Sequence, residues 1–594
     1  MEHESFEDLE TAEFLNEHYV SIKVDKEERT DIDSVYMRVC QAMTGSGGWP
    51  LTIFMTPDKK PFYAGTYFPN RSRRGYPGFM DLLEIISEQW NIQRAELLEA
   101  SEKITLHAQS IDLPVKKPET RLELLPEKCV ARLKAAFDET HGGFGKAPKF
   151  PTPHNLIFLL DYYRKLQDPA CLRMTEKTLI QMYKGGIFDH IGYGFSRYST
   201  DRQWLAPHFE KMLYDNALLL MTYTQAFMET NISFYKDVAY KIIEYVFREL
   251  TTPEGGFYSA QDADSDGEEG KYYVFTPDEI IKALGEDSGR QFNALYNITA
   301  EGNFEGRNIP NLLKCPNPSS VGPDSETLAI LRAFRASRAA LHKDDKILTA
   351  WNGLMIAALA GAYKAFGDDA LLAAAEKAVE YLEKILADGG WLYASFRNGR
   401  RGNIGFLDDY ACYSLALIEL YEATLNDIYL ERATQLCEMS VREFYDNGQG
   451  GFHLYGKSSE KLLFAPKETY DGAMPSGNSV MSWNLLMLSK LSADKQWERL
   501  AEEQIVFMTE QSAGYPEGHC FFMKALMLRL YPPKEIVCVL NDAGDLDKTR
   551  AALPKDSIIR VMPQPTDMYP LKNSRTTFYV CEGNRCLPPV NELC

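Results

Sequence analysis

The chain has 594 residues, with 64 Lys and Arg against 84 Asp and Glu, which gives a formal net charge of −20. Hydrophobic residues make up 45% of the sequence, as in ordinary globular proteins, so a disordered chain is excluded. The acidic charge argues against nucleic acid or an anionic membrane as the main partner, and no apolar stretch is long enough to span a bilayer. The 11 cysteines show no framework spacing, so we expect a reduced, cytoplasmic protein of several domains.

The first hundred residues predict a small α/β domain. Helices are expected at residues 6–16, 32–43 and 78 to about 110, and strands at 19–25, 51–55 and 61–68. Residues 112–119 combine prolines with charges and little apolar periodicity, which is typical of a linker.

From residue 126 onward a repeating pattern predicts helical hairpins. A helix ends in Gly-Gly-aromatic or a close variant, a polar connection follows, and a more apolar helix begins. Because apolar helices alternate with amphipathic ones, we expect inner and outer rings, an (α/α)6-type toroid of six or seven hairpins, with a stack of helix pairs as the alternative. The glycine stops are Gly142-Gly143-Phe144, Gly185-Gly186-Ile187, Gly255-Gly256-Phe257, Gly389-Gly390-Trp391 and Gly450-Gly451-Phe452.

In such a ring every inner helix runs in the same direction, so all their N-termini lie at one mouth. A ligand pocket is therefore predicted at this N-terminal mouth. The residues that the repeat register places there are His154, His208, Trp351, Asn352, Asp408, Asp409 and Asn478.

Residues 185–216 concentrate histidines, charges and aromatics just before an apolar run. If a helix starts at Pro207, then His208, Lys211 and Asp215 share one face. Glu210 would then lie about 200° from His208, unless the first turn is irregular. His190 lies on the preceding loop, where it could act as an acid or base or be satisfied by local backbone.

Two acidic sites could supply catalytic carboxylates. Asp262 and Asp264, with Asp266, match the first half of an EF-hand loop, but the twelfth position is Tyr273 instead of the required glutamate. Paired carboxylates for glycosidic acid–base chemistry are the sharper hypothesis, and a solvated turn is the alternative. In the pair Asp408-Asp409 one acid can cap the helix, which leaves Asp409 as our candidate.

The predicted catalytic residues are accordingly Asp262, Asp264, Asp409, His208 and His190. The predicted ligand is a small molecule such as a sugar, whose faces the aromatic side chains could stack on, although such aromatics are also common in cores. We expect no metal and no other cofactor. The predicted substrate-binding residues are Tyr198, Trp204, Lys211, Asp215, Trp351, Asn352 and Asn478.

The last sixty residues predict a small α/β region, with strands at 535–540, 557–562 and 576–580 and a helix at 546–553. Cys581, Cys586 and Cys594 form a poor zinc set, because no histidine is near. Free thiols are the favoured interpretation, and a reversible disulfide remains open.

Several long motifs resemble those of the spermatogenesis-associated protein 20 family. The resemblance implies a thioredoxin-like domain at residues 1–113, a six-hairpin glycosidase-like toroid at 120–531 that is also similar to N-acylglucosamine 2-epimerases, and a C-terminal α/β cap at 532–594. Pro50 would be the cis-proline of the redox site. The motifs are Gly47-Gly48-Trp49-Pro50, Gly65-Thr66-Tyr67-Phe68-Pro69, Lys146-Ala147-Pro148-Lys149, Ala350-Trp351-Asn352-Gly353 and Pro475-Ser476-Gly477-Asn478.

In that family a Cys-x-x-Cys precedes the position of Met1, so the expected thioredoxin-like domain is truncated and we expect no dithiol activity from this sequence. The leading hypothesis is a carbohydrate-active enzyme, a sugar hydrolase or epimerase. The alternatives are a thiol-redox or protein-folding factor and a non-catalytic protein that binds a sugar or a client.

Overall fold

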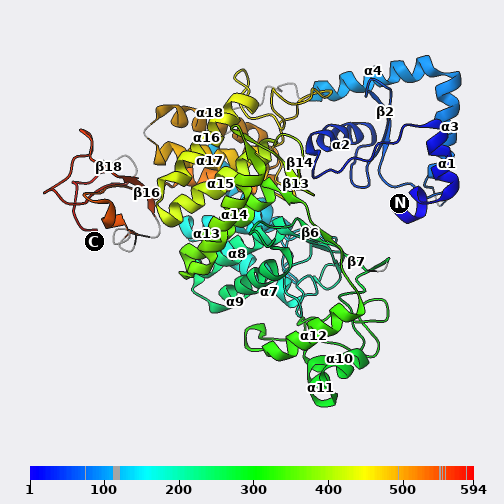
Figure 1. Cartoon of the computed structure of the whole chain (residues 1–594), viewed down its shortest axis with the longest axis horizontal. Coiled ribbons are helices and arrows are strands. Elements are labelled where there is room, and N and C mark those ends of the chain that lie inside the picture. Colours follow the sequence, from blue (N-terminus) through cyan, green and yellow to red (C-terminus); the bar gives the residue numbers. More distant parts are fainter. Residues whose placement is uncertain are drawn as a thin grey trace. The chain divides into compact units, whose positions relative to one another are not determined.

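A computed structural model describes the chain from Met1 to residue 593, except residues 74, 112–120, 266, 493, 547–549, 551–552, 555–556 and 583–584. The predicted linker lies outside the described residues, as do Asp266 and Cys594. The chain folds into two compact units (Figure 1). The first comprises Met1–Lys117 and His453–Lys467, and the second comprises Pro118–Phe452 and Glu468–Cys594.

The first unit is the α/β domain that the sequence predicts. Residues 19–25 do not form the expected strand, since Val20 and Ile22 are exposed and no strand pairs with them among the described residues. The peptide bond between Trp49 and Pro50 is cis. The elements are η1 (Glu2–Phe6), α1 (Leu9–His18), α2 (Thr30–Thr44), β1 (Thr52–Met55), β2 (Pro61–Gly65), α3 (Phe79–Ile92) and α4 (Arg94–Ile111).

A segment from far along the chain, His453–Lys467, completes this first unit. Glu460 accepts a hydrogen bond from Lys59 Nζ at 2.6 Å and pairs with Arg29 at 3.3 Å. The Gln109 amide donates to the Leu463 carbonyl at 2.8 Å. The sequence gives no sign of this long-range pairing.

The second unit is built on a closed ring of helices. Each of six inner helices contacts the next, and the last contacts the first, so the predicted toroid is confirmed and the open stack is wrong. The inner helices are α6 (Pro153–Leu166), α8 (Leu213–Thr230), α13 (Thr349–Phe366), α15 (Leu407–Thr424), α17 (Gly477–Leu491) and α19 (Cys520–Leu530).

Six outer helices each pack against an inner one. Their apolar residues follow helical spacing on one face, as Leu371, Ala375, Ala378 and Leu382 do in α14, whereas α13 is buried nearly all round. The outer helices are α5 (Leu125–Ala136), α7 (Pro169–Lys184), α9 (Ser233–Tyr245), α14 (Asp369–Leu386), α16 (Asp427–Phe444) and α18 (Lys495–Ser512).

Short strands cross the N-terminal mouth of this ring. They are β3 (Tyr198–Ser199), β4 (Pro207–His208), β5 (Lys211–Met212), β6 (Ala260–Gln261), β7 (Asp264–Ser265), β8 (Glu268–Glu269), β9 (Lys343–Asp344), β10 (Ile347–Leu348), β11 (Ala387–Asp388), β12 (Trp391–Leu392), β13 (Ser395–Arg397) and β14 (Arg400–Arg401). An insertion between α9 and α13 adds α10 (Pro277–Leu284), α11 (Glu286–Leu295) and α12 (Ser325–Arg338). None of the helices in the described part of the chain is long and apolar enough to cross a membrane.

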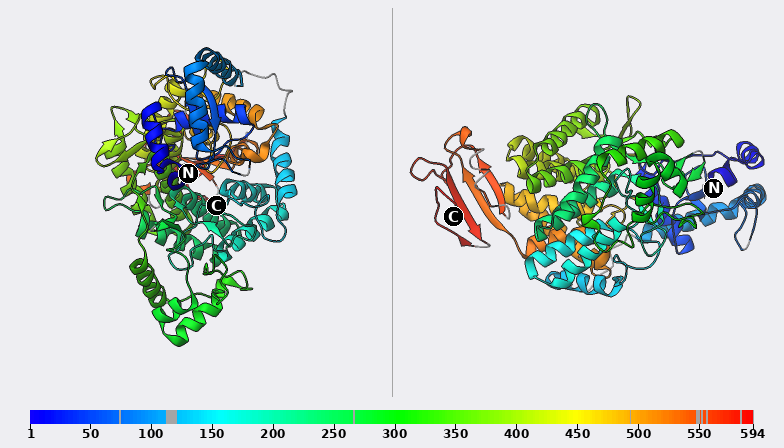
Figure 2. Two further views of the ribbon diagram at one scale, coloured as in Figure 1. Left: turned by 90° about the vertical axis from the view of Figure 1, so that its right-hand side faces the viewer. Right: turned by 90° about the horizontal axis from the view of Figure 1, so that it is seen from below.

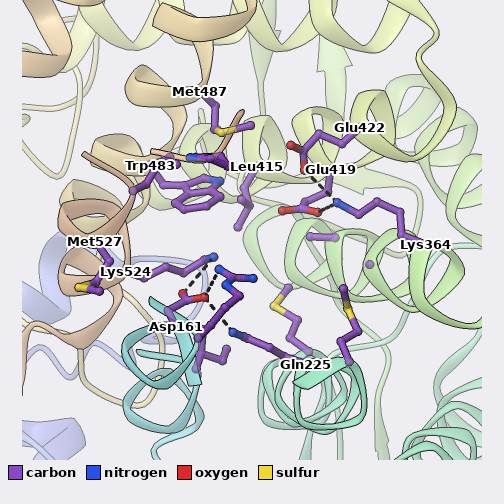
Figure 3. A pocket seen from close by; sticks show the side chains of 18 of the residues that line it. Asp161, Gln225, Lys364, Leu415, Glu419, Glu422, Trp483, Met487, Lys524 and Met527 are labelled. Carbon is purple, nitrogen blue, oxygen red and sulfur yellow. Dashed lines mark hydrogen bonds and ion pairs between the residues drawn. The ribbon is translucent and has the colours of Figure 1, made fainter. Parts of the chain in front are cut away.

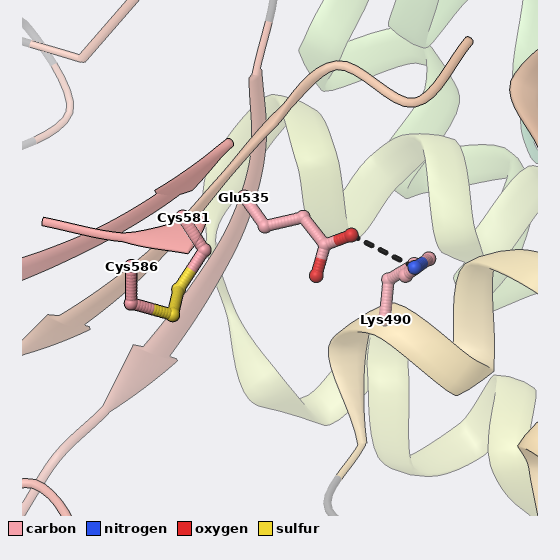
Figure 4. The surroundings of a disulfide bond; sticks show 4 residues. All are labelled: Lys490, Glu535, Cys581 and Cys586. Carbon is pink, nitrogen blue, oxygen red and sulfur yellow. Dashed lines mark ion pairs between the residues drawn. A yellow bond between two sulfur atoms is a disulfide. The ribbon is translucent and has the colours of Figure 1, made fainter. Parts of the chain in front are cut away.

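The C-terminal strands form one sheet in the order β16-β15-β17-β18, which lies beside the helices of the same unit (Figure 2). Lys490 of α17 pairs with Glu535 of β15 at 2.8 Å (Figure 4). Cys581 and Cys586 form a disulfide, so the favoured interpretation of free thiols is wrong. The strands are β15 (Lys534–Val539), β16 (Ser557–Met562), β17 (Thr577–Glu582) and β18 (Arg585–Cys586).

Candidate functional site

His208 lies on a strand and not on the helix that the sequence predicts. The helix α8 begins only at Leu213, and the residues before it are extended, with Tyr198 paired to His208 in register. In an extended chain alternate side chains share a face. His208 and Glu210 therefore lie together, while Phe209 between them is buried. The expected separation of about 200° is wrong because it assumed helical geometry.

Two carboxylates contact the His208 ring. Its Nδ1 lies 2.6 Å from Glu269 Oε1, and its Nε2 lies 3.6 Å from Glu210 Oε2. The Tyr198 ring stacks on the imidazole, with 5.3 Å between ring centroids. Burial alone would lower the pKa of His208, but Glu210 and Glu269 raise it to about 9. At neutral pH this histidine is therefore a cation.

A buried acid lies close to this histidine. Arg197 donates to Glu210 at 3.1 Å, and its charge also interacts with Tyr214 and Asp215 at the start of α8. Burial, reinforced by Glu210, raises the pKa of Asp215 well above its ordinary value, although Arg197 opposes this shift. Its Oδ2 atom is buried and has no hydrogen-bond partner in the described part of the chain. Asp215 is thus a buried carboxyl group whose protonated form is favoured by its surroundings.

We call Arg197, Tyr198, His208, Glu210, Asp215 and Glu269 the His208 cluster. Its chemistry follows from these protonation states. The histidine can give up a proton. Burial would raise the pKa of Glu210, but His208 and Arg197 outweigh it and lower that pKa. The pKa of Glu269 is lowered mainly by its hydrogen bond to His208. The cluster thus holds a protonated histidine, a buried carboxyl with a raised pKa and two glutamates with lowered pKa values, which suits general acid–base catalysis.

Trp351, a predicted substrate-binding residue, lies at the start of α13 beside this cluster. Its ring packs edge-on against Tyr214, with 4.8 Å between ring centroids. Of the predicted site residues, the structure thus brings together His208, Tyr198, Asp215 and, through Tyr214, Trp351.

Asp408 and Asp409 join the starts of three inner helices. Both Asp409 oxygens accept from backbone amides, Oδ2 from Phe406 at 2.8 Å and Oδ1 from Ala350 at 3.1 Å. Asp408 accepts from the Gly477 amide at 2.7 Å. Burial raises the pKa of Asp408 to about 6 and that of Asp409 to about 8. Asp409, the candidate chosen from the sequence, therefore has both carboxylate oxygens bound by backbone amides. The side chain of Asp408 is only partly buried.

The acidic hairpin contributes a different residue from the predicted pair. Asp262 Oδ1 accepts from the amides of Ala263 and Asp264 in its own turn, and Asp264 is exposed. The hairpin residue that reaches His208 is Glu269. Asp262 and Asp264 are thus not brought into the His208 cluster. Among the described residues no group of three or more His, Cys, Asp and Glu side chains is arranged to hold a metal ion.

Three other predicted residues are buried elsewhere. His190 packs among Tyr183, Phe188 and Tyr296, and burial lowers its pKa to about 4. Lys211 binds Asp189 at 2.8 Å in a buried cluster with Arg335, and burial lowers its pKa to about 8. Trp204 is fully buried, and its indole N–H donates to the His141 carbonyl.

The asparagines of the inner helices hold the chain before each helix. Asn352 accepts from the Phe257 amide at 2.8 Å and donates to the Phe257 and Leu348 carbonyls, both at 2.9 Å. Asn478 makes the same contacts with Phe452 and donates also to Glu468. Asn216 accepts from the Phe195 amide and donates to the Phe195 and Met212 carbonyls. The amides of Asn352 and Asn478 are thus occupied by backbone.

Sequence reasoning did not select Arg197, Glu210 or Glu269 as site residues. A signal was present in the alternation from Pro207 to Glu210, where the apolar Pro207 and Phe209 alternate with the polar His208 and Glu210. No pattern in the sequence connects Glu269 to His208, since that contact forms between two separate hairpins.

Comparison with known proteins gives the family. Residues 1–109 match a family model, Thioredox_DsbH, described as a protein of unknown function, DUF255. Human spermatogenesis-associated protein 20 is 35% identical over 667 aligned positions, which cover all of this chain and 84% of the human protein.

The fold resembles cellobiose 2-epimerase from Bacillus thermoamylovorans, with TM-score 0.47 and 12% identity over 69% of this chain and 98% of that one. It also resembles a glycoside hydrolase family 76 α-mannanase from Bacteroides thetaiotaomicron, with TM-score 0.44 and 9% identity over 69% and 97%. The chain therefore belongs to the spermatogenesis-associated protein 20 family.

Proposed function

We propose that the chain is a carbohydrate-active enzyme, a sugar hydrolase or epimerase, that acts at the N-terminal mouth of the toroid with the His208 cluster as its acid–base centre. The observation that carries the proposal is the histidine held as a cation by Glu210 and Glu269, while the buried Asp215, which interacts with Glu210 and Arg197, has a raised pKa. Groups whose environments force them into different protonation states are the usual components of acid–base sites.

Each of the two reactions assigns specific roles. An epimerase must remove a proton from a sugar carbon and return one on the other face, which needs a base and an acid. Glu210 and His208 provide such a pair. A hydrolase must protonate the leaving oxygen and assist a nucleophile with a carboxylate. His208 or Asp215 would then be the proton donor, and Glu210 or Asp408 the carboxylate.

The lining of the mouth supports a sugar ligand. Tyr198 presents a partly exposed aromatic ring beside the charged groups, while Trp351 is buried behind Tyr214, and aromatic faces with nearby polar groups are the usual surroundings of a sugar ring. The net charge of −20 disfavours a strongly anionic substrate, because the whole protein would repel it. A neutral oligosaccharide fits both features.

Incubation of the full chain in D2O with a panel of reducing mono- and oligosaccharides tests the two reactions together. Epimerisation would introduce deuterium at the carbon whose configuration changes, visible by NMR, whereas hydrolysis would release new reducing ends without such exchange. With either activity found, His208→Gln is expected to reduce kcat by about 10²–10⁴-fold, the usual contribution of a positioned proton donor.

The matched control is His342→Gln, which changes an exposed histidine of the same unit and should leave kcat unchanged. Wild-type turnover by His208→Gln would remove the His208 cluster from the mechanism. Failure of the whole panel to react or bind would count against a carbohydrate substrate.

The thioredoxin-like match at residues 1–109 keeps a thiol-redox or protein-folding role as the second candidate. Cys40 is the one cysteine among these residues in the sequence, and it is buried. Redox activity would therefore need the Cys-x-x-Cys motif that the family resemblance implies. Insulin reduction by a chain extended to restore that motif is the assay. A non-catalytic sugar-binding role would show as binding without turnover in the oligosaccharide panel.

A further inference from the structure

A cavity of about 480 Å³ lies at the other end of the toroid from the His208 cluster. Its lining residues come from the C-terminal halves of the inner helices and from β16 of the C-terminal sheet. All of them belong to the second unit. The volume is within the range of small-molecule sites. None of the residues that we assign to the proposed sugar chemistry lines this cavity.

Methionines dominate its apolar wall, with Met221, Met228, Met487 and Met527 among the lining residues. Methionine side chains adjust their shape easily and are frequent at surfaces that accept varied apolar ligands. The ring of Trp483 and the branched side chain of Leu415 add further apolar surface to the wall (Figure 3). The cavity therefore offers room for an apolar body.

The charges that line the cavity are mostly neutralised in pairs. Lys364 donates to Glu419 at 2.8 Å and to Glu422 at 2.9 Å. Asp161 accepts from Arg164 at 2.6 Å and from Gln225 at 2.9 Å. Figure 3 shows these two groups on different sides of the cavity.

Lys524 forms an ion pair with Asp161 but makes no hydrogen bond among the described residues. Its nearest carboxylate oxygen, Asp161 Oδ2, is 3.6 Å away, and its ammonium lies 3.7 Å from the centroid of the Trp483 ring. An ammonium can donate three hydrogen bonds. In the part of the chain that the structure describes, no acceptor lies within hydrogen-bonding distance of this one. A partly buried ammonium of this kind attracts an anionic acceptor.

Two further polar atoms of lining residues are unsatisfied. Thr224 Oγ1 and Trp483 Nε1 are buried without a hydrogen-bond partner among the described residues. Buried polar groups in folded proteins nearly always have partners, so such exceptions concentrate where something else binds. Both residues line the same cavity as Lys524.

We infer that this cavity is a second ligand site, which binds a small organic acid with an apolar body. The carboxylate accepts hydrogen bonds from Lys524, and the apolar body lies along Trp483 and the methionines. A charge-assisted hydrogen bond to the ammonium supplies selectivity for the acid, and burial of the apolar body supplies much of the affinity.

Octanoate is a suitable probe, with octan-1-ol as its uncharged analogue and acetate as the acid without an apolar body. Titration calorimetry on the full chain is expected to show saturable binding of octanoate. Both analogues should bind at least about tenfold more weakly, as expected for the loss of one charge-assisted hydrogen bond or of the apolar contact. Lys524→Met should weaken octanoate binding by a similar factor.

The matched control is Arg529→Met on the same helix, whose side chain pairs with Glu502 and does not line the cavity. NMR of methyl-labelled methionines in the wild type locates the site independently of any variant, and the resonances of Met487 and Met527 are expected to shift on titration. No octanoate binding, equal binding of octan-1-ol, unchanged binding by Lys524→Met, or shifts confined to methionines outside the cavity would each overturn the inference. Sugar turnover is a separate measurement that these results leave unaffected.

Discussion

At the scale of single residues, the pKa of His208 follows from its two carboxylate neighbours. We predict that Glu269→Gln lowers this pKa from about 9 toward the ordinary value, since only Glu210 at 3.6 Å remains as a charged partner. Titration of the imidazole resonances by NMR measures it. Glu268→Gln on the same strand is the matched control and should leave it unchanged. An unperturbed pKa in the wild type would contradict the described geometry.

The same shift has a defined effect on stability. The folded-state pKa of His208 is raised above its unfolded value, so its stabilising contribution is complete below about pH 6.5 and is lost as pH rises through about 9. The stability difference between the wild type and Glu269→Gln should therefore be largest at mildly acidic pH, where His208 is charged and Glu269 is still ionised, and it should shrink as pH rises through about 9. Denaturant titrations across these pH values would show it.

The sequence selected His208 and Tyr198 as site residues, and their rings do stack, but it grouped His208 with Lys211 and misjudged Glu210. The helical interpretation of Pro207 onward placed Glu210 on the wrong face, because the polar residues before an apolar run fit a helix start and a strand equally well. Glu269 could not be found, since its contact joins hairpins 61 residues apart. Local patterns show which residues carry chemistry, whereas partners across hairpins depend on tertiary structure.

At the scale of elements, three of the six inner helices, α8, α13 and α17, begin with a shared contact. An asparagine in the first turn binds the backbone of the preceding chain, as Asn216, Asn352 and Asn478 do. We predict that Asn352→Ala destabilises the protein by about 2–4 kcal/mol, because it leaves the buried Phe257 amide and two carbonyls without partners. Thermal denaturation and equilibrium unfolding measure the effect.

Asn447→Ala is the matched control, since Asn447 is exposed in a turn of the same unit. A loss of sugar binding by Asn352→Ala without any loss of stability would instead return this residue to the list of substrate contacts that the sequence suggested.

The helices were predictable because their apolar periodicity is local, but the glycine runs mark later turns and not the helix ends, since α16 already ends at Phe444. Gly451 lies in the turn after this helix with φ +74°, and a Cβ atom there would lie 2.4 Å from the Phe507 ring, so only glycine fits. The strand expected at 19–25 fails for the opposite reason. Its alternation is local, but a strand also needs a partner, and none pairs with it among the described residues. Helices satisfy their own hydrogen bonds and strands do not, which explains the difference.

At the scale of the whole molecule, the repeat pattern predicted the toroid but not its long-range contacts. Alternating apolar and amphipathic helices are visible along the chain, so inner and outer rings could be expected. The pairing of His453–Lys467 with the first unit, and the cavity at the C-terminal ends of the inner helices, depend on segments hundreds of residues apart. No local period encodes either feature.

Closure of the ring makes the first and last inner helices neighbours in space. Leu526 of α19 is fully buried, and α19 contacts α6. We predict that Leu526→Ala destabilises the toroid by about 2–5 kcal/mol through the cavity it creates, and that hydrogen exchange rises in α6 as well as in α17. In an open stack of hairpins α6 would keep its protection, because each repeat would contact only its sequence neighbours. Exchange measured by mass spectrometry separates the two architectures. Arg529→Ala on the exposed side of α19 is the control, and it should leave α6 protected.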